Sequence, residues 1–196
     1  MSNIVHDLGN LCQASSQSTN AVPRRRFFKQ CIAMGSLFGL DCVQAMPHSK
    51  DRSVALHQPK TDERLLITYF AEGRYLPSAL AKINYLLRDY YCDEVKQIDS
   101  GLIDQLHALA TLLSVRKEIE VVSGYRSPRT NAQLRRHSDA VARHSLHMEG
   151  RAVDIRVPGV AASVVRDAAL WLSNGGVGYY PGNNFVHLDT GRFRVW

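Results

Sequence analysis

The sequence predicts an α+β fold with a small, mostly antiparallel sheet flanked by helices. Helical and strand-like stretches follow one another in irregular order, which favours this class over the strict alternation of an α/β protein. The glycine-rich stretch at 175–191 contains an alternating apolar pattern and predicts a turn and a hairpin. Apolar residues make up 45% of the 196 positions, which is enough for a hydrophobic core.

Three stretches predict amphipathic helices, because apolar residues recur in them at intervals of three and four. They are residues 78–91, 99–115 and 160–173. A shorter helix is predicted at 128–137, where Pro128 suits the first turn. Strands are predicted at 65–70, 119–123 and 152–157.

The start of the chain has the organisation of an export signal. The basic stretch PRRRFFKQ at 23–30 precedes the short apolar stretch CIAMGSLFGL at 31–40, and small residues follow up to Ala45. Arg24 and Arg25 closely resemble the twin-arginine pattern of bacterial export. We therefore expect a mature protein in the periplasm, exported by the twin-arginine route.

Three parts are expected along the chain: a signal peptide over 1–45, a polar linker over 46–64 and a folded domain over 65–196. Three of the four cysteines lie in the first part, so only Cys92 stays in the mature chain. An internal disulfide and a cysteine-based zinc site are thereby excluded.

The charge pattern excludes some classes of partner. The net charge is +6, but no dense basic stripe interleaved with aromatic residues occurs, which argues against nucleic acid. A mild positive excess suits an anionic environment such as a cell wall. No apolar run reaches the roughly 18 residues that a membrane span needs. The sequence carries no signal for the oligomeric state.

The stretch HSLHMEGRAVDIRV at 144–157 brings together two residues of the metal-ligand type. Gly150 and the period-two pattern that follows argue against a helix, so we expect His147 on a loop and Asp154 on the polar face of a strand. The small side chain of Ala152 leaves room beside Asp154. A loop and a strand in this order can aim both side chains at one point.

His187, in the stretch NFVHLDT at 184–190, is the candidate for a third ligand. Two histidines and one carboxylate form the usual open zinc set, which leaves a fourth position for water. Zinc lowers the pKa of such a water to roughly 7, so that it can attack an amide at neutral pH. The alternative is that these side chains only satisfy loop backbone at strand ends.

Arg126 lies in the motif SGYRS at 123–127, where a predicted strand ends. From there its guanidinium can reach a substrate carboxylate or stabilise the oxyanion of a tetrahedral intermediate. The alternative is a solvated arginine in a turn.

The motifs SGYRS at 123–127, SLHMEGRAVDI at 145–155 and FVHLDTG at 185–191 together resemble the zinc peptidases of the LAS group. This group contains lysostaphin, D-alanyl-D-alanine peptidases and hedgehog-type domains, and the similarity is greatest to its murein endopeptidases. The resemblance covers most of residues 50–196. It implies a small antiparallel sheet flanked by helices, and the peptide part of peptidoglycan as substrate, cut at cross-links between stems.

The same resemblance implies roles for individual residues. The implied zinc ligands are His147, Asp154 and His187. Arg126 is implied as a contact to the substrate or the transition state. Some members carry a glutamate as general base three residues before the last histidine, where this chain has Asn184, and others use a His-x-His pair.

Asp189 is our candidate for the general base. It follows His187 by two positions, so both side chains point to the same face of an extended strand. Two alternatives stay open. Asp189 can orient His187 through a hydrogen bond, or it can bind the metal itself while His187 acts as the base.

The sequence therefore predicts a zinc endopeptidase that acts on peptidoglycan cross-links. A D-alanyl-D-alanine carboxypeptidase is an alternative, and it needs a wall and a cation to hold a free carboxylate, a role that Arg126 can also fill. A non-catalytic module that binds the cell wall and contains zinc is a second alternative, which the asparagine at position 184 favours.

Overall fold

The computed structural model describes residues 51–137 and 141–196, so the expected export signal lies outside the described residues. Its strands are β1 (Arg52–Gln58), β2 (Glu63–Ala71), β3 (Arg74–Tyr75), β4 (Ile119–Ser123), β5 (Ala152–Arg156), β6 (Gly176–Tyr180), β7 (Phe185–Asp189) and β8 (Arg194–Val195). Its α-helices are α1 (Pro77–Leu86), α2 (Ser100–Leu112), α3 (Pro128–Arg135) and α4 (Ala162–Leu172). Two short 3₁₀ helices are η1 (Leu146–Glu149) and η2 (Pro181–Asn183).

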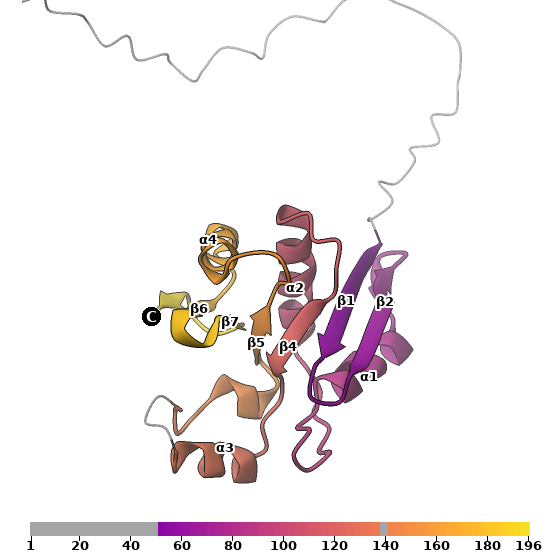
Figure 1. Ribbon diagram of the computed structural model, residues 1–196. Coiled ribbons are helices and arrows are strands. Elements are labelled where there is room, and N and C mark those ends of the chain that lie inside the picture. Colours follow the sequence, from indigo (N-terminus) through magenta and orange to yellow (C-terminus); the bar gives the residue numbers. More distant parts are fainter. Residues whose placement is uncertain (1–50, 138–140) are drawn as a thin grey trace, which may run out of the picture. The chain divides into compact units, whose positions relative to one another are not determined.

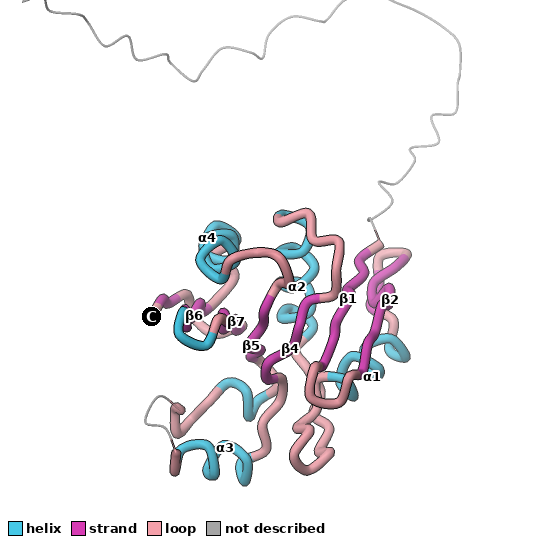
Figure 2. The backbone as a smooth tube through the Cα atoms, viewed as in Figure 1, coloured by secondary structure: helices cyan, strands magenta, loops and turns pink. Residues whose placement is uncertain are grey.

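The described strands form one sheet in the order β3-β2-β1-β4-β5-β7-β6-β8. Neighbouring strands run antiparallel except for β1 with β4 and β6 with β8, which are parallel. Figure 2 shows β1, β4 and β5 side by side in the middle of the fold. The predicted α+β class and the mostly antiparallel sheet are confirmed.

The helices are distributed unequally around the sheet. Helices α1, α2 and α4 pack against its strands, α1 on β2, α2 on β1, and α4 on β6 and β7. Helix α3 and the η1 turn lie apart from α2 and α4, beyond the ends of β4 and β5 (Figure 1). One sheet face is therefore covered by helices, and the loops that follow β4 and precede β5 gather at the strand ends.

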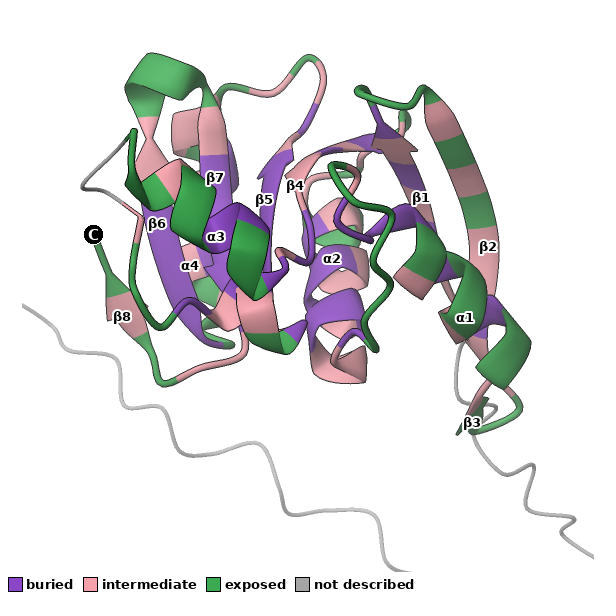
Figure 3. Cartoon of the chain, turned by 90° about the horizontal axis from the view of Figure 1, so that it is seen from below, coloured by how far each residue is buried: buried purple, intermediate pink, exposed green. Residues whose placement is uncertain are grey.

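The hydrophobic core lies between the sheet and these three helices. Strand residues Val153, Ile155 and Val186 are fully buried, as is the stripe of α2 that contains Leu102 and Leu106. Burial of such a side chain contributes roughly 1.5–3 kcal/mol. In Figure 3 the buried residues concentrate in β5, β6 and β7 and on the inner side of α2. Because apolar residues alternate with polar ones in β5 and β7, the polar side chains of these strands lie on the sheet face opposite the core.

The structure differs from the sequence prediction at residues 46–64, which were expected to form a linker. Within this stretch Arg52–Gln58 forms β1, which pairs with both β2 and β4. Its alternate residues Val54 and Leu56 are buried. Lysines, prolines and charged residues around it hide the short alternating pattern.

Helix α1 also ends earlier than predicted, at Leu86 instead of residue 91. The carbonyl of Leu87 accepts a hydrogen bond of 2.8 Å from the backbone N–H of Tyr125. The carboxylate of Asp89 accepts another, of 2.9 Å, from the backbone N–H of Ser127. These contacts to the loop after β4 replace the next helical turn.

No helix in the described part of the chain is long and apolar enough to cross a membrane.

Candidate metal centre

Asp154 and His187 lie directly opposite each other on the paired strands β5 and β7. Val153 and Ile155, on either side of Asp154, point into the core, so Asp154 must point to the opposite face of the sheet. Gly178 pairs with His187 from the other side, on β6. The strand pairing alone therefore places one carboxylate and one imidazole next to each other.

The η1 turn brings His147 to the same place. The turn begins at Ser145, whose hydroxyl accepts a hydrogen bond of 3.3 Å from the backbone N–H of His147. It ends at Gly150, which has a φ of 71°. A Cβ at Gly150 would lie 2.3 Å from the carbonyl oxygen of Gln97, so only glycine fits there. These constraints turn the chain from the loop into β5.

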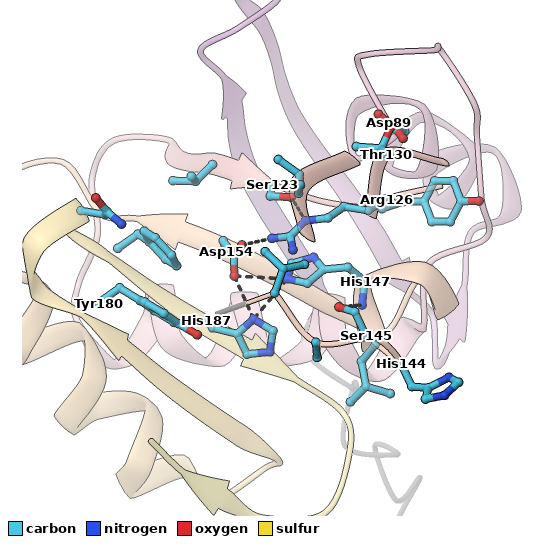
Figure 4. Close-up of a pocket in the computed structure, with 18 of the residues that line it drawn as sticks. Asp89, Ser123, Arg126, Thr130, His144, Ser145, His147, Asp154, Tyr180 and His187 are labelled. Carbon is cyan, nitrogen blue, oxygen red and sulfur yellow. Dashed lines mark hydrogen bonds and ion pairs between the residues drawn. The ribbon is translucent and has the colours of Figure 1, made fainter. Parts of the chain in front are cut away.

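Three atoms of the ligand type converge in the centre of this arrangement (Figure 4). His147 Nε2 lies 3.2 Å from Asp154 Oδ1 and 3.2 Å from His187 Nδ1. His187 Nδ1 lies 2.8 Å from Asp154 Oδ1. Ligand atoms around a tetrahedral zinc with bonds of 2.0–2.1 Å are about 3.3 Å apart. The spacing therefore fits one metal ion after small adjustments of the side chains.

The other ring nitrogens define which lone pairs face this centre. His147 Nδ1–H donates to the carbonyl oxygen of Gly124 at 2.7 Å, and His187 Nε2–H donates to Asp189 Oδ2 at 3.0 Å. A carbonyl and a carboxylate only accept hydrogen bonds, so each ring in its neutral form presents a lone pair to Asp154. Three converging lone pairs repel one another, and a positive charge between them, from a metal ion or from a proton on His187, removes that repulsion.

The pKa values of the three residues are shifted by burial and by the charges of their neighbours. Burial lowers the pKa of His147, which favours the neutral form that binds metals. Burial opposes ionisation of Asp154, but His147, His187 and Arg126 outweigh it and hold the pKa of that carboxyl far below its usual range. Burial likewise opposes a charge on His187, but Asp154 and Asp189 outweigh it and raise the pKa of the ring.

Arg126 reaches this centre from the loop after β4. Its Nε–H donates to the hydroxyl of Ser123 at 2.7 Å, and its Nη2–H donates to Asp154 Oδ2. Nη1 has no hydrogen-bond partner among the described residues. The guanidinium thus holds the outer oxygen of Asp154 and keeps further N–H groups for another acceptor.

A close approach of two backbone segments fixes the loop that carries Arg126. A Cβ at Gly124 would lie 2.4 Å from the carbonyl oxygen of Leu87, so a larger residue would push this loop away from the end of α1. The carbonyl of Gly124 is also the acceptor for His147. Gly124 is therefore a residue of the site that the sequence pattern did not single out.

Asp189 lies on the far side of His187 from Asp154 and is fully buried. Its two oxygens accept hydrogen bonds from His187, from Arg194 and from the backbone N–H groups of Gly176 and Gly191. Burial would raise the pKa of this carboxyl, but the donors outweigh it and lower the pKa far below its usual range. Such a carboxylate is a weak base. The position favours an orienting role over the role of general base predicted from the sequence.

Asn184 takes no part in the convergence. It closes η2 with a φ of 50°, and its backbone carbonyl accepts a hydrogen bond of 3.0 Å from Arg156 Nε.

His147, Asp154 and His187 are brought together as predicted, and Arg126 joins them. Their functional roles, and that of Asp189, stay predictions.

The three converging residues and Arg126 lie in the wall of a cleft of about 590 Å³. Tyr180, Phe185 and Trp196 line the same cleft. No motif in the sequence pointed to these aromatic residues, because their positions depend on the pairing of β6 with β7 and β8. The cleft is large enough to admit a peptide.

Replacement of Asp189 by asparagine distinguishes its roles. If Asp189 orients His187, we expect Asp189→Asn to weaken zinc affinity by about 10- to 100-fold, because an outer hydrogen bond fixes the ring and its basicity. Competition with a chromogenic chelator measures this. If Asp189 is the base, zinc affinity stays at the wild-type value.

Asp104→Asn is the matched control. Asp104 also accepts hydrogen bonds, from Tyr69 and Tyr75 at 2.7 Å, and pairs with Arg52 at 2.6 Å, but it does not contact the histidines. Its replacement should leave zinc affinity unchanged. An equal loss of affinity in both variants would mean that the effect comes from general destabilisation.

Comparison of the amino-acid sequence with known proteins shows the family of this chain. A family model described as Peptidoglycan L,D-endopeptidase MepK matches residues 46–196. The chain is 45% identical over 147 residues to peptidoglycan L,D-endopeptidase MepK of Escherichia coli (strain K12). This match covers 75% of this chain and 81% of that protein. The chain is 41% identical over 167 residues to a probable peptidoglycan L,D-endopeptidase MepK of Haemophilus influenzae, and this match covers 84% of this chain and 90% of that protein. The chain therefore belongs to the family of the peptidoglycan L,D-endopeptidase MepK.

Proposed function

We propose that this protein is a zinc metallopeptidase that hydrolyses peptide cross-links of peptidoglycan during cell wall remodelling. The observation that carries the proposal is the convergence of three ligand-type atoms, from His147, Asp154 and His187, in the wall of a cleft. The names of its relatives support the substrate, and they suggest cleavage between an L and a D centre.

Zinc is the metal that fits this set of donors best. Two imidazoles and one carboxylate favour zinc over magnesium or calcium, which prefer all-oxygen sites. Three protein ligands leave a fourth position for water or substrate. When bound, zinc would activate a water molecule and polarise the carbonyl group of the substrate.

The protein's own residues supply orientation and charge stabilisation. Gly124 and Asp189 accept the outer N–H groups of the two histidines and hold both rings in position. Arg126 holds Asp154, and its remaining N–H groups are suited to donate to the carbonyl oxygen as negative charge develops there. These groups keep the geometry ready before the substrate arrives.

The charges in the cleft favour an endopeptidase over a carboxypeptidase. A free carboxylate at the end of a substrate needs an uncompensated cation. Both arginines that line the described cleft are paired, Arg126 with Asp154 and Arg194 with Asp189. A peptide carbonyl within a chain needs only a hydrogen-bond donor, which Arg126 still provides.

One experiment tests the metal and the reaction together. We expect the zinc-loaded protein to release cross-linked stem peptides from purified sacculi, and a chelator to stop the release. His147→Ala, Asp154→Ala and His187→Ala should each lose most of the zinc and all measurable hydrolysis, because two remaining ligands bind zinc weakly. Metal analysis and mass spectrometry of the fragments measure both effects.

His57→Ala is the control for that experiment, since His57 pairs with Asp62 at 2.8 Å, outside the cleft. It should keep its zinc and its activity. Release of terminal D-alanine alone would indicate a carboxypeptidase. Zinc binding and binding to sacculi without hydrolysis would indicate the non-catalytic module.

Replacement of Arg126 by lysine tests its role in the reaction. Lysine keeps the charge but loses the planar fork that holds Asp154 and a second acceptor at once. We expect turnover to fall roughly a hundredfold, with zinc content near that of the wild type. Arg156→Lys is the control, because the Arg156 side chain, on the neighbouring strand, donates among the described residues only to the backbone carbonyls of Asn183 and Asn184. Wild-type turnover in Arg126→Lys would contradict the role.

We also propose that the protein acts in the periplasm after export by the twin-arginine route. The motive is the match of Arg24 and Arg25 to the twin-arginine pattern. Arg24→Lys together with Arg25→Lys should leave unprocessed protein in the cytoplasm, as detected by cell fractionation and immunoblotting. Unchanged export in a strain without the twin-arginine translocase would point to the general secretory route.

A further inference from the structure

Tyr180, Phe185 and Trp196 form an aromatic wall on one side of the cleft. Tyr180 and Phe185 lie opposite each other on β6 and β7, with stacked rings whose centres are 4.5 Å apart. The ring centre of Trp196 lies 5.2 Å from that of His187. The wall therefore begins at a predicted metal ligand and extends along the cleft.

A hydrogen bond within the wall sets the direction of the Tyr180 hydroxyl. Trp196 Nε1–H donates to Tyr180 Oη at 2.8 Å. An indole N–H can only donate, so Tyr180 is the acceptor and its own proton is left for another group. That proton has no acceptor among the described residues. Figure 4 shows the hydroxyl end of Tyr180 directed towards His187.

Tyr180 and Arg126 approach the centre from different sides. Arg126 comes from the loop after β4, and Tyr180 from the end of β6. In Figure 4 they lie on opposite sides of Asp154. A substrate carbonyl placed over the three converging atoms would therefore meet one N–H donor and one O–H donor.

We propose that Tyr180 is a catalytic residue that donates its hydroxyl proton in a hydrogen bond to the substrate carbonyl oxygen, and that Trp196 is the positioning residue that aims it. This inference rests on the proposed peptidase function. The water oxygen bonds to the carbonyl carbon while the π electron pair moves to the carbonyl oxygen, and the proton that the water gives up is passed on to the nitrogen of the leaving amine. Tyr180 and Arg126 hold that negative charge. The C=O bond then re-forms, the C–N bond breaks, and the amine leaves with a proton.

The other members of the wall cannot take this role. The only N–H of the Trp196 side chain is already donated to Tyr180, and Phe185 has no polar atom. The adjacent Tyr179 points to the other sheet face, where its ring lies 4.6 Å from the guanidinium of Arg166. Tyr179 thus supplies a matched control on the same strand.

The decisive variant is Tyr180→Phe, which removes the hydroxyl and keeps the ring stacked on Phe185. In the zinc-loaded enzyme we expect kcat on a cross-linked peptide to fall roughly a hundredfold, with little change in KM, zinc content or melting temperature. Tyr179→Phe should leave all four quantities unchanged. An equal kcat in Tyr180→Phe and the wild type would overturn the proposal.

A double-mutant cycle tests the role of Trp196. If Trp196 acts by aiming the hydroxyl, Trp196→Phe lowers kcat in the wild-type background and has little further effect in Tyr180→Phe. Equal effects in both backgrounds would show that Trp196 acts by packing against His187, and would overturn the positioning role.

A binding measurement separates this inference from the proposed function. The probe is a tetrapeptide in which a phosphinate replaces the central amide, because its tetrahedral oxygens resemble the charged intermediate. Calorimetry with the zinc-loaded protein should show affinity reduced at least tenfold in Tyr180→Phe and unchanged in Tyr179→Phe, whether or not sacculi are cut. Equal affinity in Tyr180→Phe and the wild type, or no binding by either, would overturn the role of Tyr180.

Discussion

The pairing of β5 with β7 is the constraint on which the candidate site depends. It sets Asp154 opposite His187, while Val153 and Ile155 are buried under the helices. A slip of one residue would exchange the two faces and move the carboxylate into the core. The hydrophobic core therefore fixes the register, and the register fixes the ligand geometry. One face of β5 and β7 contributes to the hydrophobic core, and the opposite face carries the candidate metal ligands.

Two carboxylates on this pair of strands are buried, and each has a histidine and an arginine as partners. Asp154 lies between His187 and Arg126, and Asp189 lies between His187 and Arg194. An unpaired buried charge is strongly destabilising, whereas charges held by several donors are tolerated. His187 is thus fixed from both sides. This chain of partners holds the ring close to the orientation that a metal site needs.

The sequence predicted most of the secondary structure, and the physical reason for each miss is identifiable. The helices α2 and α4 and the strand β5 have long or regular patterns, so local periodicity was sufficient. Strand β1 was taken for linker, because it has few apolar residues and depends on its two neighbouring strands. Helix α1 ends early at Leu86, because the carbonyl of Leu87 and the carboxylate of Asp89 bind the loop after β4.

The sequence by itself identified His147, Asp154 and His187 as candidate metal ligands, from their residue types and from their places on a loop and two strands. Only the tertiary structure decided how they are held. Gly124 supplies a carbonyl to His147, and Asp189 binds the outer nitrogen of His187 instead of facing the centre. The first contact joins two loops that are far apart in the sequence, and the second depends on the orientation of the His187 ring. A local pattern records which side chains share a face, but it does not record which atoms of distant segments meet.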